Sequence, residues 1–437
     1  YGFAASVVPV WLLLAPRDYL STFMKLGTIM ALALGIFAVM PVLQLPALTR
    51  FIDGTGPVFA GNVFPFCFIT IACGAISGFH SLIASGTTPK MITRESYARS
   101  IGYGSMLLES FVAIMAMIAA CTLQPGIYFA MNSPAALVGS TPDSAAQVIS
   151  GWGFPVTAAD MTSMARAIGE ETILGRAGGA PTLAVGMAVI FSKVIGGQTM
   201  LSLWYHFAIM FEALFILTTI DAGTRVGRFL LQAFLGNLWK PLGSLHSYKS
   251  NVFASVLFVS AWGYFLYQGV IDPLGGINSL WPLFGIANQL LSVVALCLAT
   301  TILIKMQKKR FAWITLAPMV WLVTVTFTAG LQKIFHSSPA IGFLSQARVL
   351  SQKLAAGQIA ADKIESTRQV IFNMNLNAVV VGIFLFLVGA IVLTSAWRWL
   401  QLWTGRSPLD LKETPPETGR WLSPPLVKAM IETLAAG

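Results

Sequence analysis

The sequence predicts an all-α protein that crosses a membrane several times. Hydrophobic residues make up 56% of the 437 positions and charged residues only 10%, whereas a soluble domain carries about 25% charged residues. The mean hydropathy is +0.75. The apolar residues fall into runs of about 20, the length that an α-helix needs to cross a bilayer. These observations predict a polytopic helical protein whose principal surroundings are the lipid bilayer.

The net charge of +10 is carried mainly by basic residues in the segments between apolar runs. Basic residues in such segments mark the cytoplasmic side of a membrane protein, so the charge indicates topology, and we expect no nucleic-acid partner. The cysteines lie in or at the edge of predicted spans, without the spacing of a metal site or of a disulfide framework. We expect them to be small core residues, and we expect no metal, no cofactor and no catalytic residue. The four are Cys67, Cys73, Cys121 and Cys297.

Residues 66–90 begin as a membrane helix and then fill with glycine and small polar residues. Glycine weakens a helix, and polar groups are costly in hydrocarbon. Irregular backbone at membrane depth is tolerated only where it is buried in protein or lines a cavity. The pattern therefore predicts a discontinuous helix, where transporters bind substrates or coupling ions; a tightly packed helix of small residues is the alternative. The candidate substrate-binding residues are Gly74, Ser77, Gly78, His80, Ser81, Ser85, Thr87 and Thr88.

Two spans precede this stretch and one follows it. Residues 2–15 form the first predicted span, which we expect Pro16 and the polar residues after it to end. Residues 24–42 form the second, and residues 102–121 form the one after the broken helix. The chain opens at Tyr1 inside an apolar run, so we expect further helices before it.

A polar outer loop, residues 122–181, leads into 39 mostly apolar residues, 182–220. At about 1.5 Å per residue this run is too long for one straight span, and the Gly-Gly-Gln sequence at 196–198 divides it. Residues 182–195 are then either a separate span or a re-entrant helix. Basic residues at 90–99 and 221–250 place both segments in the cytoplasm. The chain must then cross the membrane an odd number of times between the outer loop and residue 221. One span after a re-entrant helix meets this requirement, whereas two spans do not.

Four more spans complete the chain, at residues 252–271, 280–304, 311–331 and 374–396. Residues 332–372 form a predicted outer segment with an interfacial helix at 345–356, and residues 397–437 a cytoplasmic tail. The prediction is nine spans plus one re-entrant element.

Glu109 and Glu212 each lie in the middle of a predicted span. An unpaired carboxylate there costs at least ~2.5 kcal/mol, so each is either functional or paired. The functional interpretation is coupling to an ion or binding of a substrate ammonium group. The alternative is a structural ion pair, with Lys193 or His206 as the partner.

Asp221 follows the predicted span that ends at residue 220. It is a candidate for a cytoplasmic gate pair with Arg17, Lys90 or Arg94, and Asp18 lies beside Arg17. The alternative is that Asp221 is a solvated residue at a helix end.

Asn288 and Gln289 interrupt the apolar run at 280–304. Both are polar but uncharged, and amide side chains in membrane helices commonly form hydrogen bonds to neighbouring helices. We expect these two residues to have that structural role.

Four long motifs resemble the carbon starvation protein A family, whose members are peptide transporters and whose close relatives import pyruvate with protons. The resemblance implies a leucine-transporter-type fold, in which two inverted repeats of five helices form the core. Residues 1–304 would then be helices four to ten of that core, residues 305–396 would add two C-terminal helices, and the first three helices would precede Tyr1. The motifs are PVWLLLAPRDYLSTFMKLGTI, FITIACGAISGFHSLIASGTTPKMI, TTIDAGTRVGRF and LWPLFGIANQLL.

The resemblance also implies a function. We expect a secondary active transporter in the bacterial inner membrane that imports peptides or a small carboxylate such as pyruvate by alternating access. A proton or sodium gradient would drive it, and the helices expected before Tyr1 would complete the binding site. A membrane sensor that binds a nutrient without transporting it is the alternative. An intramembrane enzyme has less support, since the chain carries no HExxH motif.

Overall fold

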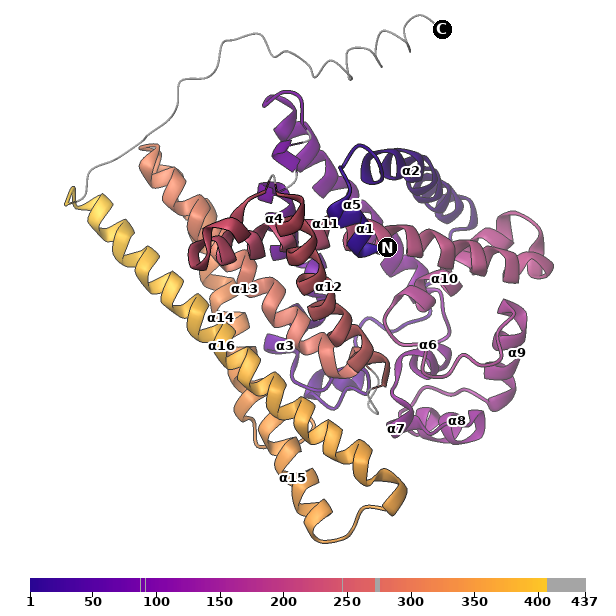
Figure 1. Cartoon of the computed structure of the whole chain (residues 1–437). Helices are drawn as coiled ribbons and strands as arrows, with labels where there is room; N and C mark the ends of the chain where they lie inside the picture. Colours follow the sequence, from indigo (N-terminus) through magenta and orange to yellow (C-terminus); the bar gives the residue numbers. More distant parts are fainter. Residues whose placement is uncertain (87, 91, 246, 272–275, 407–437) are drawn as a thin grey trace, which may run out of the picture.

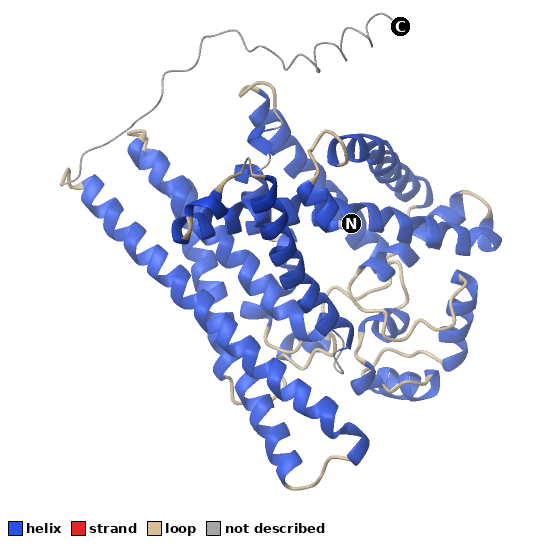
Figure 2. Cartoon of the chain, viewed as in Figure 1, coloured by secondary structure: helices blue, strands red, loops and turns tan. Residues whose placement is uncertain are grey.

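The computed structural model describes residues 1–406, apart from residues 87, 91, 246 and 272–275. All regular elements in this part of the chain are helices (Figure 2). Among the described residues, eight segments are long and apolar enough to cross a membrane. They contain α2 (Leu14–Val39), α3 (Val63–Ile71) with α4 (Gly78–Gly86), α5 (Tyr97–Cys121), α11 (Leu201–Leu238), α12 (Tyr248–Ile271), α13 (Gly276–Lys305), α14 (Trp313–Phe335) and α16 (Ile364–Trp403). The protein is therefore a multi-pass membrane protein.

The helices form two apolar cores. One core joins α2, α5 and α11 to the short apolar helix α10 (Ala180–Val194). The other joins α3, α13, α14 and α16 to α15 (Phe343–Ala355). Figure 1 shows α13, α14 and α16 side by side, with α15 at one end of them.

The predicted outer loop is a small helical unit that packs on the first core. It consists of α6 (Pro125–Asn132), α7 (Ala135–Val138), α8 (Pro142–Gly151) and α9 (Ala158–Ile168). These helices lie together at the edge of the molecule (Figure 1), and three of their large apolar residues, Ile149, Met161 and Ile168, are fully buried.

The predicted division of residues 182–220 is confirmed. α10 ends at Val194, the chain turns through Gly196 and Gly197, both with positive φ, and α11 begins at Leu201. The 15 residues of α10 span about 22 Å, less than the ~30 Å of a bilayer core. This length agrees with the expected re-entrant element.

The predicted first span is wrong, and with it the count of nine spans. α1 contains six residues, Gly2–Val7, and α2 begins at Leu14, before Pro16. Pro16 thus lies in the first turn of α2, where a helix needs no donor from its N–H. The sequence supports either interpretation of this proline, because a proline both ends one helix and begins the next.

The predicted end of a span at residue 220 is also wrong, because α11 continues to Leu238. Asp221, Arg225 and Arg228 are buried in it, with at most 5% of each residue exposed. Each of these side chains has tertiary partners, so Asp-Ala-Gly-Thr does not act as a helix end here. The two arginines are consequently not loop charges, and of the basic residues used to place residues 221–250 only Lys240 and Lys249 remain exposed.

Candidate functional site

The predicted discontinuous helix is confirmed. α3 ends at Ile71, and the chain changes direction at Ala72, whose φ is +49°. A single 3-10 turn, η2 (Ala72–Gly74), and three further residues separate α3 from α4, which begins at Gly78. A positive φ is uncommon for a residue with a side chain, so the surrounding structure must hold this break in place.

Side chains of α13 hold the broken segment. Asn288 Oδ1 accepts the Phe79 N–H at 2.9 Å, in the first turn of α4. Gln289 donates from Nε2 to the Phe68 carbonyl, near the end of α3. These bonds satisfy backbone groups on both sides of the break, as is required in a medium without water. The prediction that Asn288 and Gln289 bond to another helix is therefore confirmed.

Gly78 allows α4 to approach α13 closely. A Cβ at this position would lie 2.3 Å from the Asn288 carbonyl oxygen and 2.5 Å from Leu291 Cβ. Gly78 is buried and therefore has the role in close helix packing that the alternative interpretation gave to the small residues.

The other candidate residues of the break are partly or fully exposed. Ser77 Oγ accepts the His80 N–H at 3.2 Å and so caps α4. The remaining hydroxyls donate to carbonyls of their own segment and keep their oxygen atoms as acceptors. They are Ser81 to Ser77, Ser85 to Ser81 and Thr88 to Ile83. Gly74 and His80 are exposed, and Thr87 lies outside the described residues.

Glu109 lies beside the break. It is exposed on α5, and its carboxylate is within 4.8 Å of ligand atoms of both Cys73 and His80. The sequence places Glu109 in the middle of a span. Its neighbours depend on how α5 packs, and the hydrophobic periodicity of the sequence does not reveal this packing.

Glu212 lies half-buried on α11, at a cavity of about 370 Å³ between α5, α6, α10 and α11. Tyr128, Asn132 and Thr182 provide polar groups to the lining. Asn132 Nδ2 donates to Thr182 Oγ1 at 2.8 Å and joins α6 to α10. Burial raises the pKa of the Tyr128 phenol, which lies at this cavity.

The structural ion pairs that we considered for Glu212 are absent from the described part of the chain. Lys193 is exposed at the end of α10 and lies in none of the ion pairs there. His206 Nδ1 is 2.8 Å from the Ser202 carbonyl, one turn earlier on the same helix. Glu212 therefore faces the cavity without a cationic partner among the described residues.

Asp221 forms the candidate gate pair with Arg17, at 2.6 Å. Its side chain is fully buried, so the alternative of a solvated residue at a helix end is wrong. Arg17 also lies 2.6 Å from Asp18, and the Tyr1 hydroxyl donates to Asp221 at 3.0 Å. Arg94 lies over the Tyr97 ring instead, and the side chain of Lys90 lies outside the described residues.

The gate pair is incompletely hydrogen-bonded. Asp221 Oδ1 and two nitrogen atoms of Arg17, Nε and Nη1, are buried without a hydrogen-bond partner within the described ranges. Such a pair stabilises the folded state less than a buried pair whose polar atoms are all hydrogen-bonded.

Two buried arginines that we did not predict join α11 to α1. Arg225 donates to the carbonyls of Ala5 and Val8, and Arg228 donates to that of Ser6. The last carbonyls of a helix lack partners within it and carry partial negative charge, so the guanidinium groups satisfy the end of α1. The Arg-x-x-Arg spacing, which places both residues on one face of a helix, could have indicated this role.

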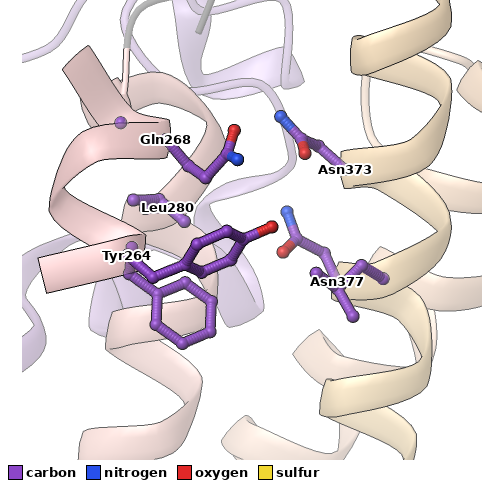
Figure 3. Close-up of a pocket in the computed structure, with 8 residues that line it drawn as sticks. Tyr264, Gln268, Leu280, Asn373 and Asn377 are labelled. Atoms are coloured by element: carbon purple, nitrogen blue, oxygen red, sulfur yellow. The ribbon is translucent and has the colours of Figure 1, made fainter. Parts of the chain in front are cut away.

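A second, small pocket lies between α12 and α16. Figure 3 shows Tyr264 and Gln268 of α12 facing Asn373 and Asn377 of α16. Its volume of about 20 Å³ holds one water molecule and no substrate. Gln369 Nε2 donates to Gln268 Oε1 at 2.9 Å, so this region is a polar contact between helices.

Comparison with known proteins identifies the family. A family model described as "Carbon starvation protein CstA" matches residues 1–329. The chain belongs to this family. No solved structure matches it, and the CstA family assignment therefore rests on sequence.

Curated relatives are similar along most of the chain. The peptide transporter CstA of Escherichia coli (strain K12) is 54% identical over 423 residues, which cover 95% of this chain and 60% of that protein. The peptide transporter CstA of Campylobacter jejuni is 57% identical over 361 residues, 81% of this chain and 51% of that protein. The pyruvate/proton symporter BtsT of Escherichia coli is 48% identical over 439 residues, 95% of this chain and 61% of that protein. The chain thus spans between half and three fifths of these relatives.

Proposed function

We propose that the protein is a secondary active transporter of the bacterial inner membrane, which imports peptides or a small carboxylate such as pyruvate by alternating access. The observation that carries this proposal is the break between α3 and α4, whose backbone groups are bonded by α13 while its polar face stays exposed. Broken helices of this kind form the midplane sites of secondary transporters. The relatives named as a peptide transporter and as a pyruvate/proton symporter support the same class.

In this proposal the helices follow a five-plus-five inverted repeat. α2 is the fifth core helix, α3 with α4 the sixth and α5 the seventh, and α10 is the re-entrant element before α11, the eighth. α12 and α13 are the ninth and tenth, and α14 and α16 lie outside the core. In the same proposal, helices of the first repeat face the break and complete the site.

Three groups of residues take distinct roles. Ser77, His80, Ser81, Ser85 and the neighbouring glycine and threonine positions contact the substrate through hydroxyl and imidazole groups. Glu212, assisted by Glu109, binds the coupling proton. Arg17 and Asp221 close the cytoplasmic side of the transporter. Opening of that side separates these two residues, whose hydrogen bonding is incomplete in the closed state.

Glu212 favours a proton over sodium as the coupling ion. Its carboxylate lines a cavity large enough for water, and no cation holds it within the described residues. A carboxyl in this position can bind a proton from one side and release it to the other.

The test is uptake into proteoliposomes that contain the purified protein. Labelled dipeptide and labelled pyruvate are offered separately, with and without an inward proton gradient. We expect accumulation of one of them that collapses with a protonophore and does not depend on sodium. Binding without accumulation would support the sensor instead, and conversion of the substrate into a new compound would support an enzyme.

A further inference from the structure

Three metal-ligating side chains meet beside the break. Cys73 lies in η2, His80 in the first turn of α4 and Glu109 on α5. Their ligand atoms all lie within 4.8 Å of one another, and Cys73 Sγ is 3.6 Å from His80 Nδ1. The three residues come from two separate spans and lack the spacing of a familiar metal motif, which is why the sequence did not indicate this cluster.

We propose that Cys73, His80 and Glu109 form a binding site for a zinc-like divalent metal ion. Zinc binds thiolate sulfur at about 2.3 Å and imidazole nitrogen at about 2.0–2.1 Å, with tetrahedral geometry. Across a tetrahedral ion these two ligands lie roughly 3.6 Å apart, which is the separation found here. Thiolate and imidazole ligands favour this class of ion over magnesium or calcium. A carboxylate oxygen also binds zinc.

Two side chains hold the backbone around His80 in place. Ser77 Oγ bonds the His80 N–H, and Asn288 of α13 bonds the N–H of the adjacent Phe79. These contacts fix the first turn of α4 relative to α13, so His80 meets Cys73 without a change in the break. Glu109 is exposed and needs only a side-chain movement to complete three-fold coordination.

A simple hydrogen bond between Cys73 and His80 is the alternative explanation of the short contact. That bond accounts for two of the residues but not for the carboxylate beside them. With three protein ligands, the ion keeps a fourth position for water or another small ligand, as in zinc sites that remain open.

A metal ion bound here would join α4 to α5 across the break. It would restrict the segment that the proposed transport cycle requires to move, and would therefore reduce transport. The binding site itself does not depend on the proposed function, because it rests on the ligand geometry alone.

Cobalt titration of the purified, detergent-solubilised protein tests this inference. Co²⁺ adopts zinc geometry and gives a thiolate-to-metal charge-transfer band when cysteine binds it. We expect one Co²⁺ per chain with this band, and we expect Zn²⁺ to displace it. Cys73→Ala should abolish the band, and Glu109→Gln should keep the band but weaken binding by at least roughly 10-fold, the loss that even an outer partner causes at metal sites.

Cys67→Ala is the matched control, since Cys67 is an exposed cysteine of α3 outside the cluster. It should leave the band and the affinity unchanged. Absence of the band in the unsubstituted protein, its survival in Cys73→Ala or an undiminished affinity in Glu109→Gln would overturn the proposal. If Cys73→Ala does not fold, His80→Gln provides the same test, and full affinity in that variant would also overturn it.

Discussion

At the scale of single residues, the Arg17–Asp221 pair is the buried ionic contact with the largest expected effect on stability. Asp221→Asn leaves Asp18 as the remaining carboxylate partner of the Arg17 guanidinium, and breaking a buried pair costs up to about 3–5 kcal/mol. We expect a clearly lower melting temperature in detergent. The Asp221 side chain is fully buried, so solvent does not compensate for the lost charge.

Asp53→Asn is the control for this substitution. Asp53 is exposed and accepts hydrogen bonds from Thr55 in its own turn, so its replacement should change stability by no more than about 0.5 kcal/mol. Equal melting temperatures for Asp221→Asn and Asp53→Asn would show that the buried pair contributes nothing to stability.

Gly78 and Gly104 make a matched pair of glycine substitutions within membrane helices. Alanine at Gly78 would place a methyl group 2.3 Å from the Asn288 carbonyl oxygen, so α4 must move away from α13. Alanine at Gly104 meets nothing within 4 Å and gains about 1 kcal/mol of helix propensity. We expect Gly78→Ala to melt below the unsubstituted protein and Gly104→Ala at or above it. The reverse order would refute close packing at Gly78.

Several residue roles could be predicted from the sequence and others could not. Asn288 and Gln289 were predictable as interhelical donors and acceptors, because an uncharged amide in an apolar run must find a partner nearby. Arg17 is a candidate partner of Asp221 from the sequence, but the burial of this pair within a longer helix was not predictable, because a partner 204 positions earlier in the chain leaves no local signal. Long-range pairing also decides the roles of Arg225 and Arg228.

At the scale of elements, the break was predictable because glycine and hydroxyl residues replace the apolar pattern within one span. The ends of α1, α2 and α11 were not, because proline and Asp-Ala-Gly sequences begin helices as well as end them. Which outcome occurs depends on tertiary partners, such as the α1 carbonyls that bind Arg225 and Arg228.

The N-terminus of α9 predicts a specific dependence on pH. Thr157 and Asp160 form a capping box. Hydrogen bonds from the Thr157 hydroxyl and N–H hold the pKa of Asp160 below its ordinary value. A carboxyl whose pKa is lowered by folding stabilises the folded state at pH values above its ordinary pKa. This contribution disappears as the pH falls through the pKa of the folded state.

Hydrogen exchange of the α9 amides, corrected for intrinsic rates, measures this contribution. Protection of the first turn should decrease between about pH 5 and pH 3 in the unsubstituted protein. In Asp160→Asn the same amides should be less protected at pH 5 and show no such decrease. A parallel decrease in both proteins would mean that another group is responsible.

At the scale of the whole molecule, the placement of loops relative to the membrane still depends on the charge rule. The exposed arginines Arg94 and Arg99 and the helical unit α6–α9 lie at opposite ends of α5. We expect the first end in the cytoplasm and the second outside. Since α11 buries Arg225 and Arg228, the expected orientation depends mainly on the basic residues at 90–99.

Impermeant maleimide labelling of whole cells tests this orientation. Ser96→Cys and Ser163→Cys each place a thiol at an exposed position, one at the start of α5 and one on α9, and the unsubstituted protein sets the background. Ser163→Cys should be labelled in intact cells, whereas Ser96→Cys should be labelled only after the cells are opened. Labelling of Ser96→Cys alone in intact cells would invert the topology.

The most direct test of proton-coupled transport compares Glu212→Gln in two assays, with Glu171→Gln, an exposed acid of the loop after α9, as the control. The first assay is uphill uptake driven by a proton gradient, and the second is exchange between equal substrate pools, which needs no net proton movement. We expect Glu212→Gln to lose uphill uptake and keep exchange, and Glu171→Gln to keep both. Retention of gradient-driven uptake in Glu212→Gln would contradict the proposed role of this carboxyl in coupling.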